Sequence, residues 1–319
     1  MKTFINDPVY YRQGFKSSLP ITLASIQHQD APLEFFLVTT DHLSEGIWFR
    51  DDQDFKVGMN YIAIISILSG IKVLAFILMS NHVHLVLQCT EEEAGWFINE
   101  LKRRYSEYLN RRYGTDDFLR LNKVDIQRLS LEDESLERAI AYTLMNCVAA
   151  NICLTASDYP WSSIKAYFQV TSPKGVRFGD MSKSSRRRTL HSKSLIPDDT
   201  VIGEDGYILP ESFIPVKFVE SIFRTPRRLN YFLLNSSKAK RRRDTSEGGL
   251  PSFKDQVILA AVPDICMSIF RKKDAAELDS DELVELIKQV RRRFSADIRQ
   301  IARVLEMSYS KVAGMLESF

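Results

Sequence analysis

Blocks of apolar and polar residues alternate along the first half of the chain and predict strands that alternate with helices. Short runs of branched and aromatic residues predict strands over 33–40, 73–79 and 82–89. Apolar residues recur at helical spacing over 55–69, 93–113 and 136–150. The alternation predicts a layered α/β or α+β domain.

The second half of the chain has a different pattern. Residues 171–194 are rich in Ser, Lys and Arg with few apolar anchors, which predicts an exposed linker or arm. A short module follows over 206–234, and from 253 onward the apolar spacing is helical almost throughout. We therefore expect a domain over 1–170, a basic linker with a small module over 171–250, and a helical domain over 251–319.

The C-terminal segment 295–319 has the spacing of a helix-turn-helix. Ile298, Ile301, Ala302 and Leu305 form one apolar face, and 306–308 is a short connection to a second helix. That second helix would open with Ser308 to Lys311 as a DNA-recognition helix. An ordinary helical bundle fits the same spacing.

Composition and charge narrow the class of partner. With 319 residues, 45% hydrophobic and 26% charged, the chain suits about two folded domains. The net charge of +2 hides an asymmetry, because residues 1–170 carry 16 Lys and Arg against 21 Asp and Glu, whereas 171–319 carry 27 against 20. Basic runs over 183–193, 238–243 and 291–293 are often only solvated surface, but three in one half favour a polyanionic partner.

Nothing in the sequence predicts secretion or a membrane span. The longest apolar stretch, 61–79, is interrupted by small residues and by Lys72, and the first fifteen residues contain no apolar run of the signal-peptide kind. The four cysteines form no Cys-x-x-Cys pair, as is typical of a reduced cytosolic protein. We expect a cytoplasmic protein that does not engage membranes.

The sharpest chemical feature is the segment MSNHVHLVL at 79–87. Alternate side chains of a strand project from the same face, so His82 and His84 point together while Val83 faces a core. Two imidazoles about 7 Å apart along a strand can converge on one divalent ion. A His-x-His pair also arises by chance, so its surroundings matter.

The helix predicted over 136–150 offers such surroundings. Tyr142 and Asn146 lie four residues apart and share one helical face. If the helix crosses the sheet, Asn146 Oδ1 can act as a third metal ligand with the Tyr142 hydroxyl beside the ion. Taken alone, an amphipathic tyrosine and a capping asparagine explain the pair equally well.

Three segments together resemble the HUH-type single-tyrosine transposases, and most closely the REP-associated tyrosine transposases. They are MSNHVHLVL at 79–87, LKRRYSEYLNRRYG at 101–114 and AYTLMNCVAANICLTASDYPWSSIKAYF at 141–168, in the family's order. The resemblance covers about residues 33–168. It implies an α+β, HUH/ferredoxin-like nuclease fold, an antiparallel sheet with packed helices, which an all-helical C-terminal region follows here.

The resemblance also implies an activity and its residues. His82 and His84 match the family's metal-binding pair, Tyr142 its nucleophile and Asn146 its third metal ligand. The implied reaction is metal-dependent cleavage and transfer of hairpin-forming single-stranded DNA through a 5′-phosphotyrosine, as in DNA transposition and recombination. Phosphate oxygens and a carboxamide ligand suit Mg²⁺ or Mn²⁺ as the divalent ion. We also expect a nucleoid-associated protein that can form a homodimer.

Other aromatic and basic residues near these motifs need an assignment. Tyr105 and Tyr108 can be mistaken for the nucleophile, but we expect them to pack their helix on the sheet. Tyr159, Trp161 and Phe168 can stack on bases, although a hydrophobic closing segment is the favoured interpretation. The residues expected to contact DNA are the basic ones at Lys102, Arg103, Arg104, Arg111, Arg112, Arg186, Arg187, Arg188, Arg241, Arg242, Arg243 and Lys311.

The sequence departs from the family pattern in two places. Cys147 and Ala149 stand where relatives commonly have proline and arginine, and no Trp-Gln segment is recognisable over 116–131. These departures keep a second hypothesis open, a catalytically impaired DNA-binding regulator on the same fold. A third hypothesis, a metal hydrolase of small substrates that uses His82 and His84, leaves the basic second half unexplained.

Overall fold

The computed structural model describes residues 3–4, 34–41, 47–115, 119, 122–150, 152–170, 174–244, 253, 255–294, 296 and 298–317. Its strands are β1 (Thr3–Phe4), β2 (Glu34–Thr40), β3 (Lys72–Met79), β4 (His82–Cys89), β5 (Val124–Leu129), β6 (Gly175–Arg177) and β7 (Val201–Gly203). Its α-helices are α2 (Asp52–Ser69), α3 (Glu91–Tyr113), α4 (Ser135–Leu144), α5 (Asn146–Ala149), α6 (Lys183–Leu190), α7 (Val216–Phe223), α8 (Pro226–Asp244), α9 (Asp255–Phe270), α10 (Ser280–Phe294), α11 (Ile298–Val304) and α12 (Tyr309–Glu317). Short 3-10 helices lie at Ala156–Asp158, Ile164–Ala166, Phe178–Asp180, Pro210–Ser212 and Ala275–Glu277.

One antiparallel sheet organises the first part of the chain. Its strand order is β1-β5-β2-β4-β3, and every neighbouring pair is antiparallel. From β2 to β5 the elements follow the order β-α-β-β-α-β, so β2 lies between β4 and β5 although neither adjoins it in sequence. The prediction of one antiparallel α+β sheet containing the three expected strands is confirmed.

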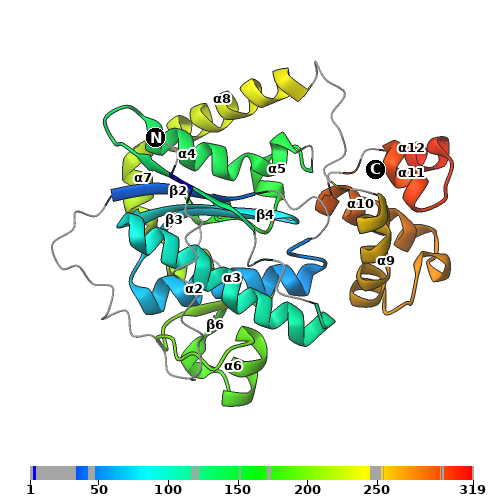
Figure 1. Ribbon diagram of the computed structural model, residues 1–319, viewed down its shortest axis with the longest axis horizontal. Helices are drawn as coiled ribbons and strands as arrows, with labels where there is room; N and C mark the ends of the chain where they lie inside the picture. Colours follow the sequence, from blue (N-terminus) through cyan, green and yellow to red (C-terminus); the bar gives the residue numbers. More distant parts are fainter. Residues whose placement is uncertain are drawn as a thin grey trace.

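Helices cover both faces of this sheet (Figure 1). α2 and α3 lie against one face, and α4, α5 and α8 lie on the other. Side chains of β4 therefore alternate between two different surroundings, with Val83 and Leu85 toward α2 and α3. The site described below lies on the α4 face.

α2 is buried on nearly all sides, which differs from the amphipathic helix expected over 55–69. One side packs on the sheet, and α6 together with the segment that contains Ile208 covers the other (Figure 1). Asn60 joins the layers, because its Nδ2 donates to Thr189 O at 2.9 Å and its Oδ1 accepts from Ile208 N at 2.8 Å. A polar residue with both ends satisfied can sit at this buried position.

The segment expected to be an exposed linker over 171–194 is folded where the structure describes it. β6 pairs with β7, and Phe178 and Leu190 are 2% and 1% exposed within the same core as the sheet. Arg186 donates to Gly179 O at 2.6 Å and lies over the Phe178 ring. Phe178 and Leu190 are too far apart to form a periodic apolar pattern. The sequence therefore did not predict that the core continues past residue 170.

The C-terminal helices α9 to α12 form a second core. The helix pair α11 and α12 occurs where the spacing predicted it, with Ile301 and Val312 fully buried. Arg293 is 3% exposed and ties this core to α2, because it donates to Arg50 O at 2.8 Å and pairs with Asp52. Among the described residues, no helix is both long and apolar enough to cross a membrane.

A buried charge cluster lies where α2 begins. Asp51 caps α2 by accepting from Asp54 N at 2.9 Å, and Arg112 pairs with both carboxylates. Tyr108 donates to Asp54 Oδ1 at 2.7 Å. Burial, together with repulsion from Asp51, raises the pKa of Asp54 to about 6, although the Arg112 guanidinium and the hydrogen bond from Tyr108 act in the opposite direction.

This pKa makes stability depend on pH. Between 3.8 and about 6 the folded carboxyl of Asp54 holds its proton while the unfolded one has lost it, so stability falls as pH rises through that window. We expect Asp54→Asn to remove this slope, on the order of 3 kcal/mol across the window. Urea unfolding at several pH values measures it. Asp41→Asn, a change at an exposed carboxylate, should keep the wild-type slope.

Candidate active site

His82 and His84 project together from the α4 face of β4. Both are buried, at 3% and 1% exposure, and their ring centroids lie 4.9 Å apart with the rings perpendicular. The intervening Val83 is fully buried on the opposite face. The sequence prediction that the two imidazoles share one face is confirmed.

Each imidazole is held through its Nδ1 atom. His82 Nδ1 donates to the side-chain oxygen of Asn81 at 2.7 Å, and His84 Nδ1 lies 3.0 Å from Thr39 Oγ1 on the neighbouring strand. An Nδ1–H that donates to oxygen leaves Nε2 as the nitrogen with a lone pair. This is the arrangement by which metal-binding histidines are oriented.

Tyr142 and Asn146 approach His84 from the helical layer. The Tyr142 ring meets His84 edge to face at a centroid distance of 5.3 Å, and Asn146 Nδ2 lies 2.9 Å from His84 Nε2. The helix expected over 136–150 is interrupted at Met145, between α4 and α5. Both side chains nevertheless reach the same imidazole, so the predicted four-residue spacing places them together.

The tyrosines differ in exposure, which separates their roles. Tyr142 is 37% exposed, whereas Tyr105 and Tyr108 on α3 are 0% and 3% exposed. Burial raises the pKa of Tyr105 and Tyr108, and both hydroxyls donate to Asp54. The prediction that these two tyrosines pack their helix is confirmed, and neither lies on the face that holds the histidines.

The residues around His84 fit a divalent ion. The donor set is two imidazole Nε2 atoms and the carboxamide of Asn146, whose Oδ1 and Nδ2 exchange places by a half-turn of the amide. Nitrogen and neutral oxygen ligands with positions left for phosphate oxygens suit Mn²⁺ or Mg²⁺. Within the described part of the chain, no three His, Cys, Asp or Glu side chains gather as a metal cluster.

Several basic residues of α3 already have partners within the chain. Lys102 is 4% exposed and donates to Asn122 O at 2.6 Å, while Arg103 and Arg104 pair with Glu100. Arg112 belongs to the charge cluster at the start of α2. α3 also covers the sheet face opposite Tyr142, so these side chains and Arg111 do not converge on the candidate site.

The later basic residues are distributed over three places. α6, which carries Arg186 to Arg188, packs against α2 on the far side of the sheet from Tyr142 (Figure 1). Lys311 is exposed near the start of α12. Arg241, Arg242 and Arg243 belong to α8, which runs along α4, but their side chains lie outside the described residues. DNA contact by these residues stays a prediction.

The aromatic segment after α5 closes the edge of the sheet. Trp161 O accepts from Leu78 N at 2.9 Å, and the Trp161 ring stacks on Phe55 at a centroid distance of 5.0 Å. Tyr159 is 1% exposed and donates to Leu78 O at 2.7 Å. The interpretation of this segment as a hydrophobic closure is confirmed for Tyr159 and Trp161.

Two residues that orient the histidines were not identified from the sequence. Asn81 lies within the quoted motif directly before His82, so its position was an available signal. Thr39 lies near the end of β2, which is distant in sequence, and only the pairing of β2 with β4 brings it beside His84. The contact between Thr39 and His84 therefore depends on the strand register and not on the local sequence.

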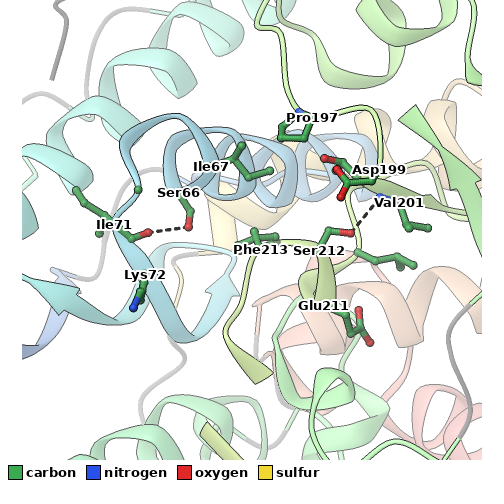
Figure 2. A pocket seen from close by; sticks show the side chains of 13 residues that line it. Ser66, Ile67, Ile71, Lys72, Pro197, Asp199, Val201, Glu211, Ser212 and Phe213 are labelled. Atoms are coloured by element: carbon green, nitrogen blue, oxygen red, sulfur yellow. Dashed lines mark hydrogen bonds between the residues drawn. The ribbon is translucent and has the colours of Figure 1, made fainter. Parts of the chain in front are cut away.

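A separate cavity of about 720 Å³ does not have His82 or His84 among its lining residues. It is lined by the C-terminal end of α2, the start of β3 and the segment 197–213, including Lys72, Asp199 and Glu211 (Figure 2). Burial raises the pKa of Glu211. None of the residues around His84 lines this cavity, so it is not part of the candidate site.

Comparisons with known proteins found no match, so the functional interpretation rests on the geometry described above. No family model matches the chain, and neither the curated proteins nor the solved structures searched contain a match.

Proposed function

We propose that the chain cleaves and rejoins single-stranded DNA through a phosphotyrosine formed on Tyr142, with a divalent ion held by His82, His84 and Asn146. The fold proposed for this activity is the HUH nuclease variant of the ferredoxin-like β-α-β-β-α-β arrangement. DNA strands that form hairpins are the proposed substrate class.

A single observation carries the proposal. The four residues singled out in the sequence come from β4, α4 and α5, yet they meet around one imidazole, with Tyr142 at 5.3 Å between ring centroids and Asn146 at 2.9 Å between nitrogens. Two metal-binding nitrogens, a carboxamide and an accessible hydroxyl suit phosphoryl transfer to tyrosine. A role for Tyr142 and Asn146 in stabilising the fold alone would not explain why both side chains lie beside the histidine pair.

Each side chain then has a distinct task. The Tyr142 hydroxyl gives up its proton to solvent as its oxygen attacks the phosphorus, the bond from phosphorus to the 3′ oxygen breaks, and the 3′ oxygen takes up a proton from solvent and leaves as a hydroxyl. Asn81 and Thr39 keep the two Nε2 atoms directed at the site. A bound divalent ion supplies charge neutralisation at the scissile phosphate. The phosphotyrosine retains the bond energy needed for rejoining.

The test uses a labelled hairpin oligonucleotide with a single-stranded flank, incubated with the full chain with and without Mn²⁺. We expect cleavage and a covalent protein–DNA band in the presence of Mn²⁺ and neither in its absence. EDTA added to the loaded protein should stop further cleavage.

Two outcomes would contradict the proposal. Binding of the hairpin without cleavage, on several hairpins and with either metal, would favour the regulator hypothesis that the departures at Cys147 and Ala149 keep open. Cleavage that is independent of metal would remove His82 and His84 from the mechanism.

A further inference from the structure

We propose that the adjoining outer faces of α4 and α8 hold a DNA single strand beside Tyr142, with Arg138 binding a backbone phosphate and Tyr231 stacking on an unpaired base. The inference rests on the proposed function for its reaction, but the binding that it describes is measurable without cleavage. Neither Arg138 nor Tyr231 was singled out from the sequence.

The solvent face of α4 consists of two side chains. Within Ser135–Leu144, only Arg138 and Tyr142 are exposed. They lie four residues apart, so they are neighbours on one helical face, about 6 Å apart along the axis. A strand that lies along this face with one phosphate at the Tyr142 hydroxyl brings a neighbouring phosphate to the Arg138 guanidinium, which suits phosphate geometry.

The Arg138 guanidinium is available to such a phosphate. It pairs with Glu134 at 3.3 Å, and 69% and 45% of the two side chains are exposed to solvent. A surface pair of this kind contributes little stability. Glu134 also accepts from Arg228 Nη2 at 3.2 Å, so it keeps a partner when Arg138 turns to DNA.

α8 continues this surface. Arg228, near the start of α8, bridges Glu134 and Glu137 near the start of α4, and α8 also contacts α5, which follows α4. The two helices therefore run side by side in the same direction (Figure 1). Tyr231 lies three residues beyond Arg228 on a neighbouring part of the helix surface and is 63% exposed. The surface thus extends from α4 to the ring of Tyr231.

The chemistry of this surface matches a DNA single strand. From 226 to 243 the sequence of α8 contains seven Lys and Arg residues and no Asp or Glu, so the helix is complementary to phosphates. An exposed aromatic ring adds affinity for unpaired bases, whose faces are open to stacking, whereas the bases of a duplex stack on one another. The basic residues of α3, in contrast, lie on the other side of the sheet from Tyr142.

The test measures DNA binding separately from cleavage. A fluorescein-labelled oligonucleotide that forms no hairpin is titrated with the full chain in EDTA, and fluorescence anisotropy is recorded at several salt concentrations. Arg138→Gln should reduce the slope of log affinity against log salt by about 0.7, the value for one phosphate contact on a single strand. Tyr231→Ala should weaken binding at least about fivefold, whereas Tyr231→Phe keeps the ring and should bind like the wild type.

Arg128→Gln is the matched control for Arg138→Gln. Arg128 is also 69% exposed and also pairs with a glutamate, Glu34. It lies opposite Phe36, which is three residues from Thr39 along β2, so Arg128 points to the sheet face opposite the histidines. Its replacement should leave the affinity and the salt slope at wild-type values.

Four results would overturn the surface. They are no binding of the single strand by the wild type, a wild-type salt slope in Arg138→Gln, wild-type affinity in Tyr231→Ala, and binding of a blunt duplex of equal length as tight as that of the single strand. If the variants behave as expected but the wild type cleaves no hairpin with Mn²⁺, the proposed function fails while the surface stands.

Discussion

Tyr142→Phe is expected to abolish the covalent protein–DNA adduct while leaving the fold intact. The change removes one oxygen and keeps the ring that meets His84 edge to face at 5.3 Å, so the packing contact survives. If the missing oxygen is the nucleophile, adduct formation should drop by at least about a thousandfold. A denaturing gel of a labelled hairpin incubated with Mn²⁺ measures it.

The chain supplies matched controls for this change. Tyr105→Phe and Tyr108→Phe each remove a hydroxyl that donates to Asp54, which should lower stability by about 1 kcal/mol. Both variants should still form the adduct, because their rings lie on the α3 side of the sheet. An adduct that persists in Tyr142→Phe would refute the assignment, and one lost only in Tyr105→Phe would move the nucleophile to α3.

Local patterns predicted the elements whose apolar residues are dense or regularly spaced. The strands β2, β3 and β4 and the long helix α3 were expected close to their observed bounds, because the strands are short runs rich in branched and aromatic residues and α3 repeats its apolar residues at helical spacing. β5 was not expected, because its apolar and polar residues alternate only over Val124 to Gln127 before Arg128 breaks the alternation. Its partners on both sides stabilise it as a strand, and sequence alone does not contain that information.

The candidate site likewise contains residues that local spacing predicted and residues that it did not. His82 and His84 lie two residues apart, and Tyr142 and Asn146 four, so their common faces follow from strand and helix geometry. Thr39 joins them only through strand order, which puts β2 beside β4. Which residues lie opposite one another on neighbouring strands depends on the tertiary structure, and it cannot be predicted from a single sequence.

Charge patterns were the least informative part of the sequence. The run of basic residues on α3 resembled a DNA-binding face, yet most of its members pair with acidic residues or backbone oxygens of the same chain. Arg293 is similarly committed to Arg50 and Asp52. Net charge along a sequence counts such residues as available, because their partners are distant in the chain.

The second large effect is expected at the histidines. His82→Ala and His84→Ala should each abolish Mn²⁺-dependent cleavage, because each removes one of the two imidazoles that we propose as metal ligands. DNA affinity should remain within about threefold of wild type, since the basic residues that we propose to contact phosphates lie elsewhere in the chain. Cleavage assays and filter binding at one salt concentration measure the two quantities separately.

His84→Ala needs a stability check, because Thr39 and Asn146 both lose a buried partner. Such a loss destabilises by about 1–3 kcal/mol, which thermal unfolding detects. His191→Asn is the matched control: it changes a histidine at the left-handed end of α6, where φ is 47° and asparagine is tolerated. That variant should keep both cleavage and binding. Equal losses of affinity and cleavage in His82→Ala and His84→Ala would mean that the pair supports DNA binding, not chemistry.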